Sequence, residues 1–166
     1  MIPPLHRLFA YCLPLLFSFS GCGFHLRGVV EIPPDLNPLY IQAKPGSRVR
    51  SALLDRLQGS QVRPAKSAEA ARVIVRILQE SKASRVTAVD ENNKVVASEL
   101  FLHLRFDAID GQGKTLVPVQ SLQLSRTYEN PDVQVLGKEQ EANLIYEDLA
   151  QEGAERILYR LRAALL

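Results

Sequence analysis

Apolar and polar residues alternate most regularly between residues 94 and 109. Leu100, Leu102, Leu104, Phe106 and Ala108 fall on one face, and Glu99, His103, Arg105 and Asp107 fall on the other, with Phe101 as the exception. A period of two with a single apolar face is typical of a strand in an antiparallel sheet that is covered on one side. The pattern therefore predicts a strand over 94–109 with one buried and one solvated face.

Further strands are predicted before and after this one. A short strand is expected at 39–43, and the β-rich segment 72–89 is joined to the central strand by the "DENN" turn at 90–93. "DGQGK" at 110–114 predicts a second hairpin, which leads into a strand over 115–128.

The predicted strand over 115–128 contains an irregularity. Its apolar phase changes between Val119 and Leu122, which indicates a bulge. Pro118 cannot donate to a sheet ladder, so this part of the strand belongs at a sheet edge or at the bulge itself.

Two segments follow a helical period instead. Ser47 is a candidate N-cap for a helix that runs to Gln58, with Gly59 as its C-terminal stop. Its apolar stripe is formed by Val49, Leu53 and Leu57.

A long final helix is expected from about Gly137 to the end of the chain. The apolar residues near one of its faces are Ile145, Leu149, Ile157, Leu161 and Leu165, with Leu158 beside them.

The order of these elements is β-α-β-β-β-α. Two amphipathic helices can cover one face of a sheet, so we expect an α/β (α+β) two-layer sandwich. Its four-stranded, mostly antiparallel sheet is covered on one face by two helices. The length of 166 residues suits one domain, which we place at 39–166.

Composition excludes several classes of function. The formal net charge of +2 at pH 7 is close to neutral and the charges are spread along the chain, which argues against nucleic-acid binding. Both cysteines, Cys12 and Cys22, lie in the first 22 residues, so the rest of the chain has no zinc ribbon or disulfide framework. His25 and His103 are far apart and suggest no metal site, and no nucleophile motif is present. We therefore expect no enzyme activity, catalytic residue, metal or cofactor.

The N-terminus has the pattern of a secretory signal peptide. Arg7 precedes an uncharged run over 8–19, which is too short for a transmembrane helix. The run ends in the stretch "FSFSGCGFHLRG", where Ser20 and Gly21 precede Cys22. This resembles the lipobox of bacterial lipoproteins, whose small residues admit the peptidase and whose cysteine thiolate takes up the lipid.

The lipobox interpretation divides the N-terminal part of the chain. It makes 1–21 a cleaved lipoprotein signal peptide and 22–38 a tether, with S-diacylglycerol and N-palmitoyl groups on Cys22. Several acyl chains on one cysteine give stable membrane anchoring. The alternative is an inert cysteine buried in an N-terminal helix. The residue after Cys22 is Gly23 rather than the Asp that marks inner-membrane retention in lipoproteins, which points to the outer membrane.

Basic residues near the first hairpin are the candidates for a binding site. Lys82, Arg85 and Lys94 gather around the 90–93 turn if the two strands pair through it. Such a cluster can hold phosphates, with Arg as a bidentate donor and Lys as a point charge. The alternative, which charge alone favours, is an ordinary solvated strand end.

The segment Cys-Gly-Phe-His-Leu-Arg at 22–27 closely resembles the start of mature lipopolysaccharide (LPS)-assembly lipoproteins of the LptE family. The order of elements and the motif Arg126-x-Tyr128-x-Asn130-Pro131 before the last helix also resemble that family. The resemblance extends over the whole chain.

Membership in that family implies a function without catalysis. Its members are anchored in the inner leaflet of the outer membrane, on the periplasmic side. They sit as a plug inside the large β-barrel protein LptD, help it assemble, and bind LPS during delivery to the cell surface. Family members contact lipid A phosphates with basic residues at two places, which correspond here to Lys94 and Lys138. Competing interpretations are a lipoprotein pilot for another outer-membrane channel and a lipid-anchored periplasmic enzyme.

Overall fold

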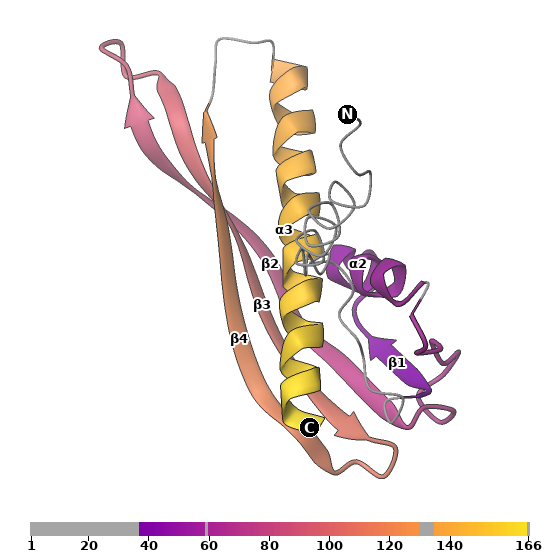
Figure 1. Ribbon diagram of the computed structural model, residues 1–166. Helices are drawn as coiled ribbons and strands as arrows, with labels where there is room; N and C mark the ends of the chain where they lie inside the picture. The colour runs from indigo at the N-terminus through magenta and orange to yellow at the C-terminus, as the bar shows by residue number, and fades with distance from the viewer. Residues whose placement is uncertain (1–36, 59, 130–134, 166) are drawn as a thin grey trace, which may run out of the picture.

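The computed structural model describes residues 37–58, 60–129 and 135–165 (Figure 1). Its elements are β1 (Leu39–Gln42), α2 (Arg48–Leu57), β2 (Val73–Val89), β3 (Val95–Asp110), β4 (Thr115–Glu129) and α3 (Val135–Leu165). Both the type and the order of the predicted elements are confirmed, and their bounds differ from the predicted ones by a few residues.

The strands form one sheet in the order β1-β2-β3-β4. β1 runs parallel to β2, whereas β2, β3 and β4 are antiparallel neighbours. A parallel pair needs a crossover connection, which α2 supplies between β1 and β2. Figure 1 shows α3 lying along the length of the sheet, with α2 beside it near β1. The two helices therefore cover one face, and the predicted two-layer fold is confirmed.

The core lies between α3 and the face of β3 that sequence periodicity predicted to be buried. Leu100, Leu102, Leu104, Phe106 and Ala108 are all at most 5% exposed. They meet the apolar stripe of α3, in which Leu149, Ile157 and Leu161 are fully buried. At Gly153 the helix lies close to the sheet, because a Cβ there would stand 2.7 Å from Cδ1 of Leu104.

The bulge predicted in β4 is present. Phe106 pairs with Gln120 and Ala108 pairs with Val117, so β4 holds one more residue than β3 between these two pairs. Pro118 lies within this irregular part of β4, which is an edge strand of the sheet. Its lack of an N–H donor is tolerated at such a position.

Asp107 corrects one expectation, because it is buried rather than solvated. Only 4% of Asp107 is exposed, although it lies on the polar face of β3. The guanidinium of Arg76 on β2 donates two hydrogen bonds to its carboxylate, one of them 2.7 Å from Nε to Oδ1. A buried carboxylate needs such a partner, and the hydrogen bond in turn raises the pKa of Arg76.

No helix in the described ranges is long and apolar enough to cross a membrane.

Candidate functional site

The tip of the β2–β3 hairpin is built around the carboxylate of Asp90. Its Oδ1 accepts hydrogen bonds from the backbone N–H groups of Asn92 at 2.9 Å and Lys94 at 2.8 Å. Asn93 has φ 59°, in the left-handed region that asparagine tolerates better than most residues. Asp90 of the "DENN" turn therefore fixes the backbone that carries Lys94.

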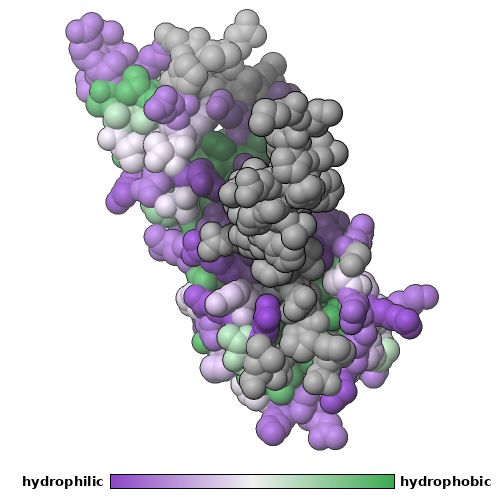
Figure 2. Space-filling model, viewed as in Figure 1, coloured by the Kyte–Doolittle hydropathy of each residue, from purple (hydrophilic) through white to green (hydrophobic). Residues whose placement is uncertain are grey.

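This hairpin extends past the end of β4 (Figure 1). The pairing of β3 with β4 ends at Ala97 and Glu129, whereas β2 and β3 stay paired up to Val89 and Val95. Val89 and Val96 in this part of the hairpin are exposed, as is Val86 just before it. In Figure 2 apolar side chains lie next to the hydrophilic tip of the hairpin.

The structure does not gather Lys82, Arg85 and Lys94 into one cluster. Lys82 pairs in register with the core residue Leu102, and its Nζ lies 4.5 Å from the centre of the Tyr146 ring on α3. Arg85 points from the opposite face, where it forms a 2.7 Å salt bridge with Glu99 and lies over Phe101. The expectation of a single cluster is therefore wrong for Lys82, whereas the binding of LPS by these residues stays a prediction.

The other predicted site residues are Lys138 and Cys22. Lys138 falls in the first turn of α3, but its side chain lies outside the described residues. Cys22 and the signal peptide also lie outside them. The predicted roles of these residues stay predictions.

The motif Arg126-x-Tyr128 joins the end of β4 to α3. The Arg126 guanidinium lies 3.5 Å from a carboxylate oxygen of Glu152 on α3. Tyr128 is 8% exposed, and burial raises the pKa of its hydroxyl, as do the charge and hydrogen bond of Glu141 on α3. This half of the motif thus has a structural role, and its Asn130-Pro131 half lies outside the described residues.

The outer face of the sheet, opposite the two helices, is largely polar. Residues that face each other across antiparallel strands share a face, so the register defines its members. They include Gln79, Ser81, Arg85, Glu99, Phe101, His103, Arg105, Ser121, Gln123, Ser125 and Thr127. Phe101 and His103 stack with ring centres 5.9 Å apart. The described helices leave this surface uncovered, and it suits a polar environment.

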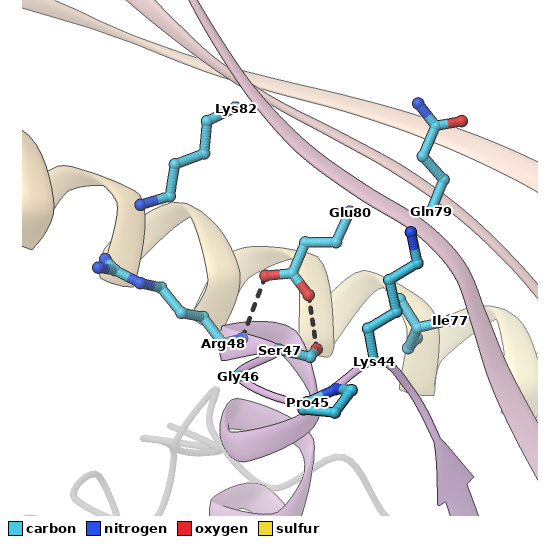
Figure 3. A pocket seen from close by; sticks show the side chains of 9 residues that line it. All are labelled: Lys44, Pro45, Gly46, Ser47, Arg48, Ile77, Gln79, Glu80 and Lys82. Carbon is cyan, nitrogen blue, oxygen red and sulfur yellow. Dashed lines mark hydrogen bonds between the residues drawn. The ribbon is translucent and has the colours of Figure 1, made fainter.

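A second candidate site, which the sequence did not predict, lies beside the start of α2. A cavity of about 280 Å³ is lined by Lys44, Pro45, Gly46, Ser47, Arg48, Ile77, Gln79, Glu80 and Lys82 (Figure 3). Ser47 is the N-cap that the sequence predicts, and its side chain accepts a hydrogen bond from the Arg50 N–H. Glu80 was not predicted, because no local pattern relates a strand residue to a helix start 32 residues away.

The family model described as "LptE: Lipopolysaccharide-assembly" matches residues 36–161. Proteins named LPS-assembly lipoprotein LptE from Pectobacterium atrosepticum and Photorhabdus laumondii are each 24% identical over 94% of this chain, which corresponds to 85% and 86% of their own lengths.

Solved structures show the same fold. A solution structure of an uncharacterized lipoprotein B from Nitrosomonas europaea has a TM-score of 0.68 at 26% identity and covers 85% of this chain and 91% of its own. The rare lipoprotein B from Shewanella oneidensis has a TM-score of 0.66 at 19% identity, covering 76% of this chain and 95% of its own.

Proposed function

Because the chain belongs to the LptE family of lipopolysaccharide assembly, we propose that it acts in the outer membrane together with an LptD-type β-barrel. In this proposal the two proteins form the LPS translocon. The chain is the plug and assembly factor of the barrel, and it binds LPS for insertion at the cell surface. It carries out no catalysis.

The uncovered polar face of the sheet is the observation that supports the plug role. The interior of a large outer-membrane barrel is polar, so a plug needs polar surface toward the barrel wall. Gln123, Ser125 and Thr127 on β4 offer amide and hydroxyl groups for such contacts, and all three are exposed. A protein whose partner covered this face with apolar side chains would show an apolar surface here instead.

The proposed place of the chain is the periplasmic side of the outer membrane, with Cys22 as its lipid anchor. The short apolar run and the small residues before Cys22 support this assignment. We expect Cys22→Ala to leave the precursor uncleaved and without the mass of added acyl chains. Normal processing and lipid labelling of that variant would refute the anchor.

Affinity purification of the full-length lipoprotein from detergent-solubilised outer membranes, followed by mass spectrometry, tests the partner. We expect a large β-barrel of the LptD type to co-purify. Recovery of a secretin ring instead would replace this function with that of a pilot for another channel.

A further inference from the structure

We propose that the cavity beside the start of α2 binds a phosphate group through Lys44, Arg48 and Lys82. The group is carried either by a lipid headgroup or by a free phosphate compound. The cavity is distinct from the hairpin tip, because it lies between β2 and the start of α2.

The charges that line the cavity do not cancel. Three cationic side chains line it, whereas two carboxylates lie close to them: Glu80 in the lining, and Glu147 on α3, 3.7 Å from the Arg48 guanidinium. Both oxygens of the Glu80 carboxylate are already used, since Oε2 accepts from the Ser47 hydroxyl at 2.5 Å and Oε1 accepts from the Arg48 N–H at 3.1 Å. Glu80 therefore caps the helix, and an incoming anion would bind beside it.

Lys82 and Arg48 form one wall of the cavity with two like charges side by side. Figure 3 shows their side chains pointing toward each other, on the far side of Glu80 from Lys44. Burial lowers the pKa of Lys82, and the charge of Arg48 lowers it further, whereas Glu80 and Glu147 act in the opposite direction. An anion placed between the two cations would relieve their repulsion.

Contacts with α3 fix the orientation of the Arg48 side chain. Its guanidinium donates to the backbone oxygen of Asn143 at 2.9 Å and to Oδ1 of the same residue at 3.1 Å, and it lies 3.7 Å from Glu147. These contacts orient the group and leave it further N–H donors. An oriented guanidinium is well suited to bind a phosphate, because less freedom is lost on binding.

Lys44 supplies the opposite wall. It is exposed, and within the described ranges its amine has no carboxylate at salt-bridge distance. Its flexible stem allows the amine to reach a ligand that Arg48 and Lys82 already hold. A doubly charged oxyanion with several acceptor oxygens matches such a set of donors better than a single carboxylate does.

The test uses the mature lipoprotein in zwitterionic micelles and two probes. Sodium pyrophosphate is titrated by calorimetry, and micelles of short-chain phosphatidylcholine with and without phosphatidic acid report on a lipid-borne phosphate. The variants are Lys44→Gln and Lys82→Gln. The matched control is Lys114→Gln, which removes an exposed lysine in the β3–β4 turn. Thermal unfolding of each variant verifies that the fold is kept.

We expect saturable binding of at least one probe, weakened about tenfold by each cavity substitution and unchanged by the control, since one lost charge-assisted contact corresponds to roughly that factor. Binding of pyrophosphate alone assigns the site to a free compound, and binding of phosphatidic acid alone assigns it to a headgroup. Binding of neither probe, or equal binding in all variants, overturns the inference. If the chain still co-purifies with the barrel in that case, only this inference is refuted and the proposed function stands.

Discussion

Ser47 and Glu80 are joined by a 2.5 Å hydrogen bond from hydroxyl to carboxylate, although they are 33 residues apart in the chain. Ser47 caps α2 and Glu80 lies in β2, on the face that the helices cover. The bond therefore fastens the start of α2 to the sheet. A carboxylate at this position also interacts favourably with the positive end of the helix dipole.

The first prediction concerns this contact. Glu80→Ala removes the acceptor of the Ser47 hydroxyl and of the Arg48 N–H, so we expect it to lower the free energy of unfolding by about 1–2 kcal/mol. Urea denaturation followed by circular dichroism measures the change. The control is Gln79→Ala, at the neighbouring residue on the opposite face of β2. It should lower the free energy of unfolding much less than Glu80→Ala does. Equal losses in both variants would show that Glu80 has no capping role.

The second prediction concerns the close packing of α3 on the sheet at Gly153. A Cβ on Gly153 would lie 2.7 Å from Cδ1 of Leu104 and 3.2 Å from Cδ1 of Leu124. Gly153→Val adds branched bulk there, so we expect a loss of about 2 kcal/mol from overpacking. Gly153→Ala is the matched control. The alanine gains about 1 kcal/mol in helix propensity. This gain offsets the cost of moving the two leucine side chains slightly, so the free energy of unfolding stays nearly unchanged. A valine variant as stable as the alanine variant would contradict the tight packing.

The third prediction concerns pH. The pKa of Glu99 lies below its ordinary value, first because of a hydrogen bond from Ser125 and second because of Arg85. A carboxylate whose pKa is lower in the folded than in the unfolded chain stabilises the fold above the unfolded pKa. That contribution is lost as the pH falls through the folded pKa.

Ser125→Ala should therefore raise the pKa of Glu99 more than Arg85→Gln does, in a titration of the Glu99 carboxyl carbon by NMR. It should also flatten the acid limb of the stability curve. A pKa that moves only in the Arg85 variant would show that the ion pair, and not the hydrogen bond, sets the ionisation of Glu99.

The fourth prediction addresses the basic residues that the family resemblance implies for LPS. Lys94→Ala and Lys138→Ala should each weaken the binding of LPS to the purified lipoprotein by several-fold, because each removes a charge-assisted contact to phosphate. Lys114→Ala, at the tip of the other hairpin, is the control. Unchanged affinity in both variants would refute this site while leaving the plug role untouched.

Sequence periodicity predicted most of the fold because the core depends on local patterns. The alternation in β3 and the stripe of Val49, Leu53 and Leu57 each place apolar side chains on one side, and the structure buries them. The same alternation explains why Lys82 and Arg85 do not meet, since residues three apart on a strand point to opposite faces. The partners of Glu80 and Asp107 were not predictable, because long-range pairing depends on the register between strands and on the docking of α2.

The plug role is tested most directly by crosslinking from the polar face of the sheet in living cells. A photoreactive amino acid replaces Gln123, which is exposed on β4, and the products are identified by mass spectrometry after irradiation. Unirradiated cells and the purified chain irradiated alone are the controls. If the chain is a barrel plug, irradiation should give a light-dependent adduct with a large outer-membrane β-barrel of the LptD type. A folded and lipidated chain that forms adducts only with other proteins, or none at all, would contradict the plug role.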